Sequence, residues 1–388
     1  MQFRDSATGV REESVPKMSP ASRTRALDPF AFINYRTVVT LVVVMVLGLS
    51  NMGIVDGAEA IYIFGDSYLD TGNIPATIVP YGSNWPGYPA GRWSDGRGLT
   101  DYFAELFGLP TPTPYLHLKN DSSPLQGINF ARTAAGITYA FGVTELDSQV
   151  DDMEALVHND VLTNDHLKKS VTVLNIGVND YDVRNFQAPF QESAFRVQEL
   201  KTYVHTVVNG IAVNIVRLHS FGIRNIVVLN LPLLVCMPLS TLEVALDFKA
   251  CSSNNTFINE TSLHNSLLQQ RVRMLNQNLK GLNVIIADQA KAFGQLFYHG
   301  SDYGFVNPLT PCCHGSNNYN LYSYVCGQVD AEGKPIYTVC KDPNKAVLFD
   351  VIHPTQAASK TMVDLYASVS GYTSEGPKLK DWIRKYNV

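Results

Sequence analysis

The sequence predicts a doubly wound α/β fold, in which helices cover both faces of a parallel sheet. Short apolar runs rich in β-branched residues alternate with long stretches of helical periodicity along the 388 residues. The apolar runs are continuous, and this is typical of strands buried on both faces. Only 17% of the residues are charged, against a usual fraction of about 25%, which also favours an extensively buried sheet.

Four apolar runs are the expected core strands. The first ends at Gly65 and the second at Gly177, and glycine commonly marks the end of a strand. The four runs are residues 60–64, 171–176, 223–231 and 284–287.

Three helices are expected between and after these strands, at 191–219, at 262–281 and after Pro354. Apolar residues recur in them at a spacing of three or four, which places them on one buried face. In the first helix these are Val197, Leu200, Val204, Val208, Ile211 and Ile215, and in the last they are Met362, Leu365, Tyr366 and Val369. Long irregular inserts are expected at 74–126 and 297–345. No linker or internal repeat divides the chain, so one domain covering residues 61–388 is expected.

Composition excludes two broad classes of protein. The 45% of hydrophobic residues is too many for a disordered chain. The net charge of −5 argues against a nucleic-acid-binding protein that is guided by a basic surface.

Residues 1–60 are interpreted as an N-terminal extension and signal peptide. The uncharged apolar run Thr37–Leu49 follows Arg36, and Ala58-Glu59-Ala60 is a small-x-small cleavage pattern. The run is shorter than the roughly 20 residues that cross a bilayer as a helix. We therefore expect a secreted, extracellular protein with no membrane span after cleavage. An uncleaved signal-anchor is the alternative, because the segment before the run is long, and Met18 is an alternative start.

Cysteines and glycosylation motifs agree with export. An even number of cysteines in a secreted chain indicates disulfides, and adjacent Cys312 and Cys313 are expected to take separate partners. The sequence leaves the pairing open. The cysteines are Cys236, Cys251, Cys312, Cys313, Cys326 and Cys340. The Asn-x-Ser/Thr motifs, which are interpreted as glycosylation sites or plain polar loops, are at Asn120, Asn254 and Asn259.

A serine, an aspartate and a histidine form a candidate triad. Ser67 follows the first strand, at the sheet edge where reacting groups gather in such folds. Asp350 precedes His353 by three residues, so its carboxylate can reach the imidazole within one loop. The pattern predicts Ser67 as nucleophile, His353 as general base and Asp350 as the residue that orients it. Taken singly, each is also typical of a turn or a helix cap.

Two further segments could stabilise an oxyanion. Asn179 follows the second strand and can direct its side-chain N–H groups at a developing negative charge. The loop 127–137 is rich in small residues and can bring a backbone N–H close to a substrate.

Four segments have now been singled out: the turn at Ser67, the loop 127–137, the turn at Asn179, and the loop with Asp350 and His353. In this order they resemble the plant GDSL esterase/lipases of the SGNH hydrolase superfamily. The segments 89–97 and 307–313 are also similar to that family. The resemblance implies a flavodoxin-like, three-layer α/β/α fold with a parallel sheet. It also implies hydrolysis of a small-molecule ester or lipid by the triad through an acyl-enzyme, without a cofactor or metal. The oxyanion would be held by the Ser67 N–H, a backbone N–H of the 127–137 loop and Asn179.

One segment departs from the family pattern. A glycine-rich step is usual after Asn129-Phe130-Ala131, but here Arg132, Thr133 and Ala134 follow. The backbone donor to the oxyanion is then Thr133 or Ala134. A branched threonine resists the positive φ that glycine allows. Two alternatives to hydrolysis remain open: a catalytically weakened binding or modifier protein, and an acyltransferase that uses the same acyl-enzyme.

Two other features have competing interpretations. Cys312-Cys313-His314 lacks the cysteine spacing of a zinc site, and export favours disulfides there. The aromatic residues of the first insert either line an acyl or sugar site or simply pack that insert. They are Tyr81, Trp85, Tyr88 and Trp93.

Overall fold

A computed structural model describes the protein at residues 57–74, 78–86, 91–118, 126–138, 145–181, 194–241, 248–252, 255–315 and 326–388. The chain divides into two units, residues 1–54 and 55–388, and all the described residues belong to the second. The apolar run Thr37–Leu49, the motif residues Asn120 and Asn254, and Tyr88 lie outside the described residues.

A central sheet forms the core of the second unit. Within the described residues its strand order is β2-β3-β1-β4-β5-β6-β9. All neighbouring strands are parallel except β9, which is antiparallel to β6. The five neighbouring strands β3-β1-β4-β5-β6, numbered among themselves along the chain, have the 2-1-3-4-5 order of flavodoxin-like folds. The strands are β1 (Ile61–Gly65), β2 (Thr113–Pro114), β3 (Gly127–Asn129), β4 (Val171–Asn175), β5 (Asn225–Leu229), β6 (Asn283–Ala287) and β9 (Thr373–Ser374).

The four strands expected from the sequence are confirmed as β1, β4, β5 and β6. The predicted parallel sheet is confirmed, with one antiparallel strand added at an edge. There the chain turns back after helix α10 (Gln356–Ser368) and adds the two-residue strand β9 against β6. Such an antiparallel edge is common on an otherwise parallel sheet. The other edge strands, β2 and β3, are too short to show a periodic pattern.

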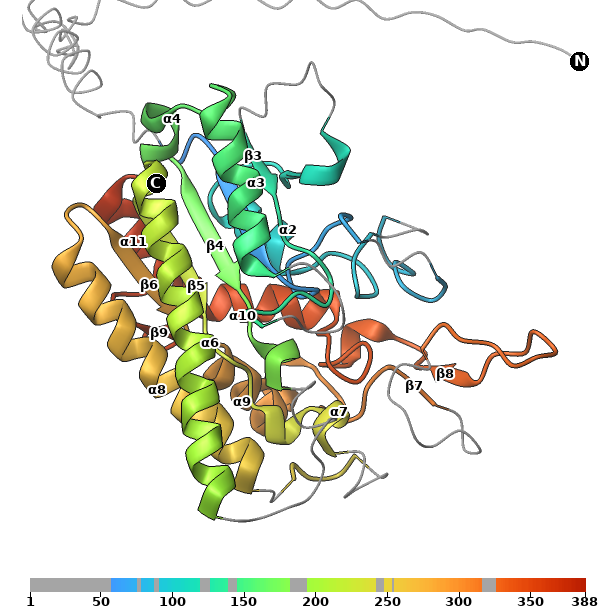
Figure 1. The fold of residues 1–388 in the computed structure, drawn as a ribbon. Helices are drawn as coiled ribbons and strands as arrows, with labels where there is room; N and C mark the ends of the chain where they lie inside the picture. Colours follow the sequence, from blue (N-terminus) through green and yellow to red (C-terminus); the bar gives the residue numbers. More distant parts are fainter. Residues whose placement is uncertain are drawn as a thin grey trace, which may run out of the picture. The chain divides into compact units, whose positions relative to one another are not determined.

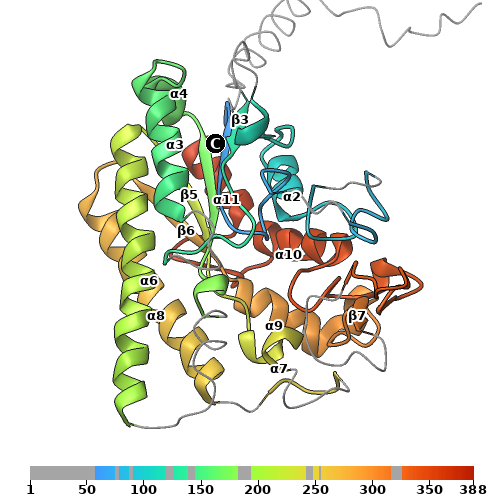
Figure 2. The same ribbon diagram turned by 45° about the vertical axis from the view of Figure 1, so that its right-hand side comes forward.

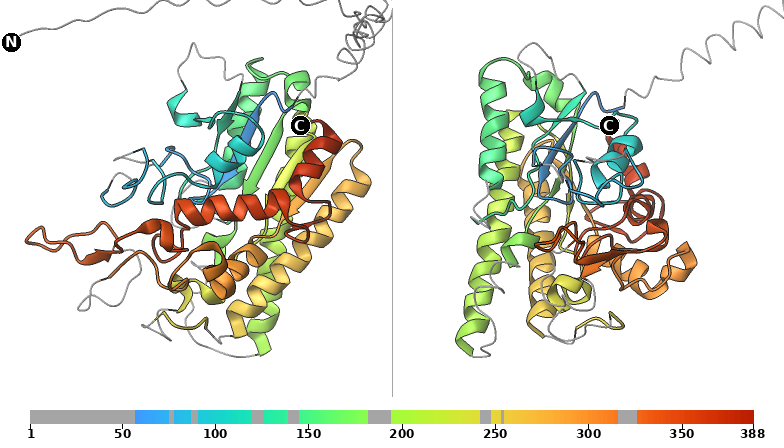
Figure 3. Two further views of the ribbon diagram at one scale, coloured as in Figure 1. Left: turned by 180° about the vertical axis from the view of Figure 1, so that it is seen from behind. Right: turned by 90° about the vertical axis from the view of Figure 1, so that its right-hand side faces the viewer.

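Helices cover both faces of the sheet, as Figures 1, 2 and 3 show. Helix α6 packs between α3 and α8 on one face, and α10 contacts α2, α9 and α11 on the other. The three-layer arrangement predicted by the resemblance is therefore confirmed. The remaining helices are α2 (Leu99–Leu106), α3 (Leu146–His158), α4 (Asn164–Lys168), α6 (Ala194–Phe221), α7 (Pro238–Thr241), α8 (Asn255–Asn278), α9 (Gln289–His299) and α11 (Leu379–Tyr386).

The predicted helices differ from the observed ones mainly at their ends. Helix α8 begins at Asn255, before the expected start, and the motif residue Asn259 is therefore exposed on a helix instead of in a loop. Val369 is the C-cap of α10 and is 43% exposed, so it does not continue the buried face. Helix α2 also lies within the first insert, which was expected to be irregular.

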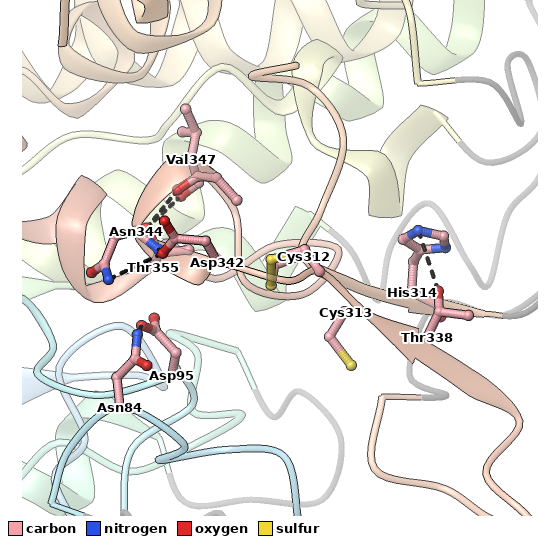
Figure 4. Close-up of a disulfide and its surroundings, with 12 residues drawn as sticks. Asn84, Asp95, Cys312, Cys313, His314, Thr338, Asp342, Asn344, Val347 and Thr355 are labelled. Carbon is pink, nitrogen blue, oxygen red and sulfur yellow. Dashed lines mark hydrogen bonds between the residues drawn. A yellow bond between two sulfur atoms is a disulfide. The ribbon is translucent and has the colours of Figure 1, made fainter. Parts of the chain in front are cut away.

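The second insert contains a small antiparallel hairpin, β7 (Cys313–Gly315) and β8 (Tyr337–Val339), and two disulfides lie within this insert. Cys312 pairs with Cys340, Cys313 with Cys326, and Cys236 with Cys251. Figure 4 shows the sulfur atoms of Cys312 and Cys313 pointing in different directions. The prediction of separate partners is confirmed, and disulfide bonding leaves neither sulfur as a thiolate for a metal ion.

Short 3₁₀ turns complete the described chain, at 115–117, 234–236, 300–303 and 343–345. Among the described helices none is both long enough and apolar enough to cross a membrane.

Burial on both faces explains why the central strands read as continuous apolar runs. Every residue of β1, β4 and β5 is buried. Gly65 ends β1 at φ +144°, and a Cβ there would lie 2.0 Å from the Asn175 carbonyl oxygen of β4. Only glycine therefore allows the two strands to pair up to this point. The chain leaves β1 toward β3, while β4 lies on its other side, so the strand order reverses here and the loops diverge.

Candidate active site

Ser67, His353 and Asp350 lie in one hydrogen-bonded chain. The Nε2 atom of His353 is 2.8 Å from Ser67 Oγ, and its Nδ1 atom is 2.7 Å from Asp350 Oδ2. Ser67 follows β1 directly, whereas the other two residues precede α10. With the Nδ1 proton directed at the carboxylate, Nε2 is free to accept the serine hydroxyl proton. The structure thus brings Ser67 together with two residues of one loop, of which His353 lies 286 positions later in the sequence.

The carboxylate of Asp350 accepts four hydrogen bonds. Its Oδ1 atom accepts the N–H groups of Ile352 at 3.0 Å and His353 at 2.8 Å. Its Oδ2 atom accepts the Tyr81 hydroxyl at 2.8 Å in addition to the imidazole of His353. Burial raises the pKa of Asp350, but the charge and hydrogen bonds of His353 outweigh it, so the pKa lies below its ordinary value. Asp350 is therefore ionised at neutral pH.

Aromatic rings enclose the imidazole of His353. Trp93 stacks on it with ring centroids 5.9 Å apart, and the Tyr68 ring lies 5.6 Å away. The Tyr68 hydroxyl donates to the Ile352 carbonyl at 2.7 Å, which fixes that ring beside the loop. These contacts leave His353 little freedom to rotate away from Ser67.

The aromatic residues of the first insert therefore have different roles. Tyr81 contacts Asp350 and Trp93 contacts His353, and neither interpretation of the sequence contained these contacts. Trp85 instead contacts the guanidinium groups of Arg92 and Arg97, which lie 4.8 and 5.2 Å from its ring centroid. The sequence gives no sign that Tyr81 and Trp93 make these contacts, because Asp350 and His353 lie more than 250 residues later in the chain.

The same insert is fastened to the loop that carries His353. Ser94 Oγ donates to the Pro354 carbonyl at 2.8 Å, and Asp95 accepts the N–H of Gln356 at 2.7 Å. Asn84 holds the other carboxylate oxygen of Asp95 at 2.6 Å, as drawn in Figure 4. Tyr81, Ser94 and Asp95 thus hydrogen-bond to the loop at several points, from Asp350 to the first turn of α10.

Thr133 and Ala134 differ in whether their backbone N–H is available. The Thr133 N–H donates to Asp70 Oδ2 at 2.8 Å, and its hydroxyl lies 3.1 Å from the same oxygen. Ala134 takes the left-handed conformation at φ +66°, and among the described residues none accepts its N–H. The positive φ expected from the family's glycine therefore falls on Ala134. Of the two alternatives left by the sequence, Ala134 is the one whose N–H has no acceptor in the described part of the chain.

The side chain of Arg132 is directed toward helix α3. Its guanidinium pairs with Asp152 at 2.5 Å and is only 12% exposed, while its N–H donates to the Gly65 carbonyl at 2.9 Å. Burial, as the largest influence, raises the pKa of Asp152 even though the Arg132 charge opposes it. The cation is therefore committed to a structural ion pair.

Asn179 is oriented by one of its two amide hydrogens. Its Nδ2 atom donates to the Ala135 carbonyl at 2.9 Å, which leaves the second hydrogen for another acceptor. Among the described residues none accepts the Ser67 N–H either. Ser67, Ala134 and Asn179 thus each retain a donor in the turns that follow β1, β3 and β4.

Asp180 fixes the far end of the 133–138 segment. This buried carboxylate accepts the Ile137 N–H at 3.0 Å, and the N–H and hydroxyl of Thr138 at 2.7 Å each. Asp70 holds the near end through Thr133, so two buried acids hold the segment that contains Ala134. Burial raises the pKa of both acids, although their hydrogen bonds oppose it.

Asp66, the residue before Ser67, is fully buried. Its Oδ1 atom accepts the Tyr68 N–H at 3.1 Å, and its Oδ2 atom has no hydrogen-bond partner among the described residues. Burial raises its pKa to about 7, despite the hydrogen bond from Tyr68 and the charge of His353.

A hollow of about 590 Å³ lies elsewhere, between α8 and α9. Its polar side chains Asn230 and Asp288 bond to each other at 3.0 Å and to the first turn of α9. It contains no residue of the Ser67–His353 chain, so geometry favours the latter as the reaction centre. No cluster of three or more metal-ligating side chains occurs in the described part of the chain.

Comparison with known proteins identifies similar chains. The GDSL-like Lipase/Acylhydrolase family matches residues 61–366, a span that includes every residue of the site. One GDSL esterase/lipase of Arabidopsis thaliana is 36% identical over 311 residues, which cover 76% of this chain and 82% of the relative. Another from the same plant is 33% identical over 310 residues, with coverage of 76% and 84%. Among solved structures, an acetyl xylan esterase from Geobacillus stearothermophilus aligns over 80% of this chain and 93% of its own, at a TM-score of 0.34 and 13% identity.

Proposed function

The chain belongs to the GDSL-like lipase/acylhydrolase family, and from that premise we propose that it is a secreted carboxylic ester hydrolase acting through Ser67, His353 and Asp350. The observation that carries this proposal is the unbroken chain of contacts, 2.8 Å from Ser67 to His353 and 2.7 Å from His353 to Asp350. Nucleophile, base and orienting acid are all within hydrogen-bond reach, which is the geometric requirement for this chemistry.

In the first half of the reaction, Ser67 Oγ attacks the acyl carbonyl carbon while His353 Nε2 takes the hydroxyl proton. The ionised Asp350 stabilises the imidazolium that forms. When the tetrahedral intermediate collapses, the ester C–O bond breaks and His353 returns the proton to the departing alcohol. The acyl group remains on Ser67 as an ester.

Three donors support the negative charge on the carbonyl oxygen: the N–H of Ser67, the N–H of Ala134 and the Nδ2 group of Asn179. Each follows a different strand, so the sheet holds them in a fixed arrangement before the substrate arrives. Donors arranged in advance need no reorganisation as charge develops, which is the main source of their effect.

Water completes the cycle on the acyl-enzyme. His353 Nε2 removes a proton from water, whose oxygen attacks the acyl carbon, and Ser67 leaves with that proton as the acid is released. The two alternatives raised by the sequence differ from hydrolysis at different steps of this cycle. An acyltransferase would use another alcohol in place of water. A weakened binding protein was suggested by Arg132 and Thr133. Their side chains bond to Asp152 and Asp70, which supports hydrolysis over that alternative.

We further propose that the protein passes through the secretory pathway, with cleavage after Ala60 and glycans at Asn120, Asn254 and Asn259. Three disulfides in the described residues support this proposal, because structural disulfides persist in oxidising compartments. Mass spectrometry of the protein recovered from the medium, before and after glycosidase treatment, tests both the cleavage site and the glycans.

The catalytic assignment is tested with the secreted chain and its Ser67→Ala variant on p-nitrophenyl esters of short and medium chain length. We expect the variant to lose nearly all turnover and all labelling by a fluorophosphonate probe, which reacts only with an activated serine. Equal turnover in the two proteins would exclude Ser67 as the nucleophile. Turnover of the wild type with added alcohols, followed by product analysis, separates hydrolysis from acyl transfer.

A further inference from the structure

We propose that Tyr81 is a positioning residue of the triad, whose hydroxyl holds the Asp350 carboxylate in place and in its ionised form for His353. This inference rests on the proposed function. Tyr81 comes from the first insert, 269 residues before Asp350 in the sequence. It gives that insert a role in the chemistry besides shaping a substrate site.

The geometry of Tyr81 suits this role. Its hydroxyl donates to Asp350 Oδ2 at 2.8 Å, the same oxygen that accepts the His353 imidazole. The side chain is only 3% exposed. Its ring meets those of Trp93 and Phe349 edge to face, with centroids 5.1 and 5.2 Å apart. Packing of the ring therefore holds the Tyr81 hydroxyl in position to donate to the Asp350 carboxylate.

Without this donor, a buried carboxylate would be left short of one hydrogen bond. Asp350 is 4% exposed, so loss of a donor costs its ionised form more than it would at the surface. The Asp350–His353 pair would then take up a proton at a higher pH. Besides Ser67 and Trp93, two titratable groups of the described residues face the pair: Tyr68, whose ring lies beside His353, and Asp66, whose pKa is affected by the charge of His353.

The chain offers a matched control in Tyr337. Its hydroxyl donates to the Val79 carbonyl at 3.2 Å, two residues before Tyr81, and its ring packs against the same cluster. Tyr337→Phe therefore removes a tyrosine hydroxyl that ties down the same segment but does not touch the triad. Tyr81→Phe keeps the ring and removes the hydroxyl that donates to Asp350.

The experiment compares the wild type, Tyr81→Phe, Tyr337→Phe and Ser67→Ala on p-nitrophenyl butyrate from pH 5 to 9. Turnover is followed at the isosbestic wavelength of p-nitrophenol and its anion, so that the signal does not depend on pH. Thermal unfolding is recorded for each protein. We expect Tyr81→Phe to lower kcat/KM about tenfold at pH 6 and to move its acidic limb up by about one pH unit. Tyr337→Phe should retain the wild-type profile.

The outcomes separate the two proposals. The positioning role is overturned if the pH profile of Tyr81→Phe equals that of the wild type, or if both phenylalanine variants lose rate evenly across pH with equal falls in Tm. Either result would assign Tyr81 a packing role only. Retained turnover in Ser67→Ala would instead overturn the proposed function itself, whatever Tyr81 does.

Discussion

The clearest test of how the oxyanion donor is held is Asp180→Asn. This change preserves the shape of the side chain and removes its charge. In the structure the carboxylate accepts the N–H groups of Ile137 and Thr138 and the Thr138 hydroxyl, at 2.7 to 3.1 Å. An asparagine can keep its oxygen toward Thr138 and toward the Ile137 N–H at 3.1 Å, but its NH₂ group would replace the second oxygen, which faces this N–H at 3.0 Å.

The expected cost can be worked out from these bonds. The Ile137 N–H and the N–H and hydroxyl of Thr138 change from a charged to a neutral acceptor, at about 1 kcal/mol each. We expect the free energy of unfolding to fall by about 3 kcal/mol, which a domain of ordinary stability survives. If the 134–138 segment moves, the Ala134 N–H leaves the oxyanion, and kcat falls by about tenfold to a thousandfold.

The assay measures kcat and KM on p-nitrophenyl butyrate, with urea unfolding for each protein. Because the oxyanion forms only in the transition state, kcat should fall while KM stays near its wild-type value. Asp288→Asn is the matched control. Asp288 follows β6, caps α9 through the Lys291 N–H at 3.0 Å and lies in the separate hollow. It should lose some stability and keep its kcat. The reasoning is refuted if Asp180→Asn is destabilised as calculated but keeps kcat within twofold of the wild type.

Three further predictions concern stability. Ala134→Gly relieves a left-handed alanine at φ +66°, so the free energy of unfolding should rise by about 0.5–1 kcal/mol with kcat unchanged, and a lower Tm would contradict this. Burial raises the pKa of Asp66 to about 7 in the folded protein, whereas in the unfolded chain this carboxyl ionises near pH 4. The stability that the protonated Asp66 contributes is therefore lost as the pH rises from about 4 to 7. Asp66→Asn should remove that slope, about 1.4 kcal/mol per pH unit, in urea unfolding measured at pH 5, 6 and 7, and an unchanged slope would show that Asp66 is not its source. Replacing both Cys236 and Cys251, which are 15 residues apart, with serine should lower the free energy of unfolding by about 3 kcal/mol, and a variant as stable as the wild type would show that this loop is constrained by packing alone.

Much of the framework was predictable because it depends on short-range patterns. The buried strands β1, β4, β5 and β6 are continuous apolar runs, and α6 and α10 are marked by apolar residues at helical spacing. Elements of two or three residues, such as β2, β3 and β9, carry no period at all. Their pairing is decided by strands already in place, so sequence reasoning could not find them.

The sequence by itself determined the order of the chemistry along the chain: Ser67 after a first strand, Asn179 after a later one, and Asp350 and His353 in one loop. Local turns and strand ends specify these positions, since each depends on its immediate neighbours. The tertiary structure alone decided which partner each polar group meets. Thr133 gives its N–H to Asp70, Ala134 is left in the left-handed conformation, and Tyr81 reaches Asp350. A hydrogen bond between residues 269 positions apart leaves no periodic trace in the sequence, because it exists only once the sheet has brought both ends together.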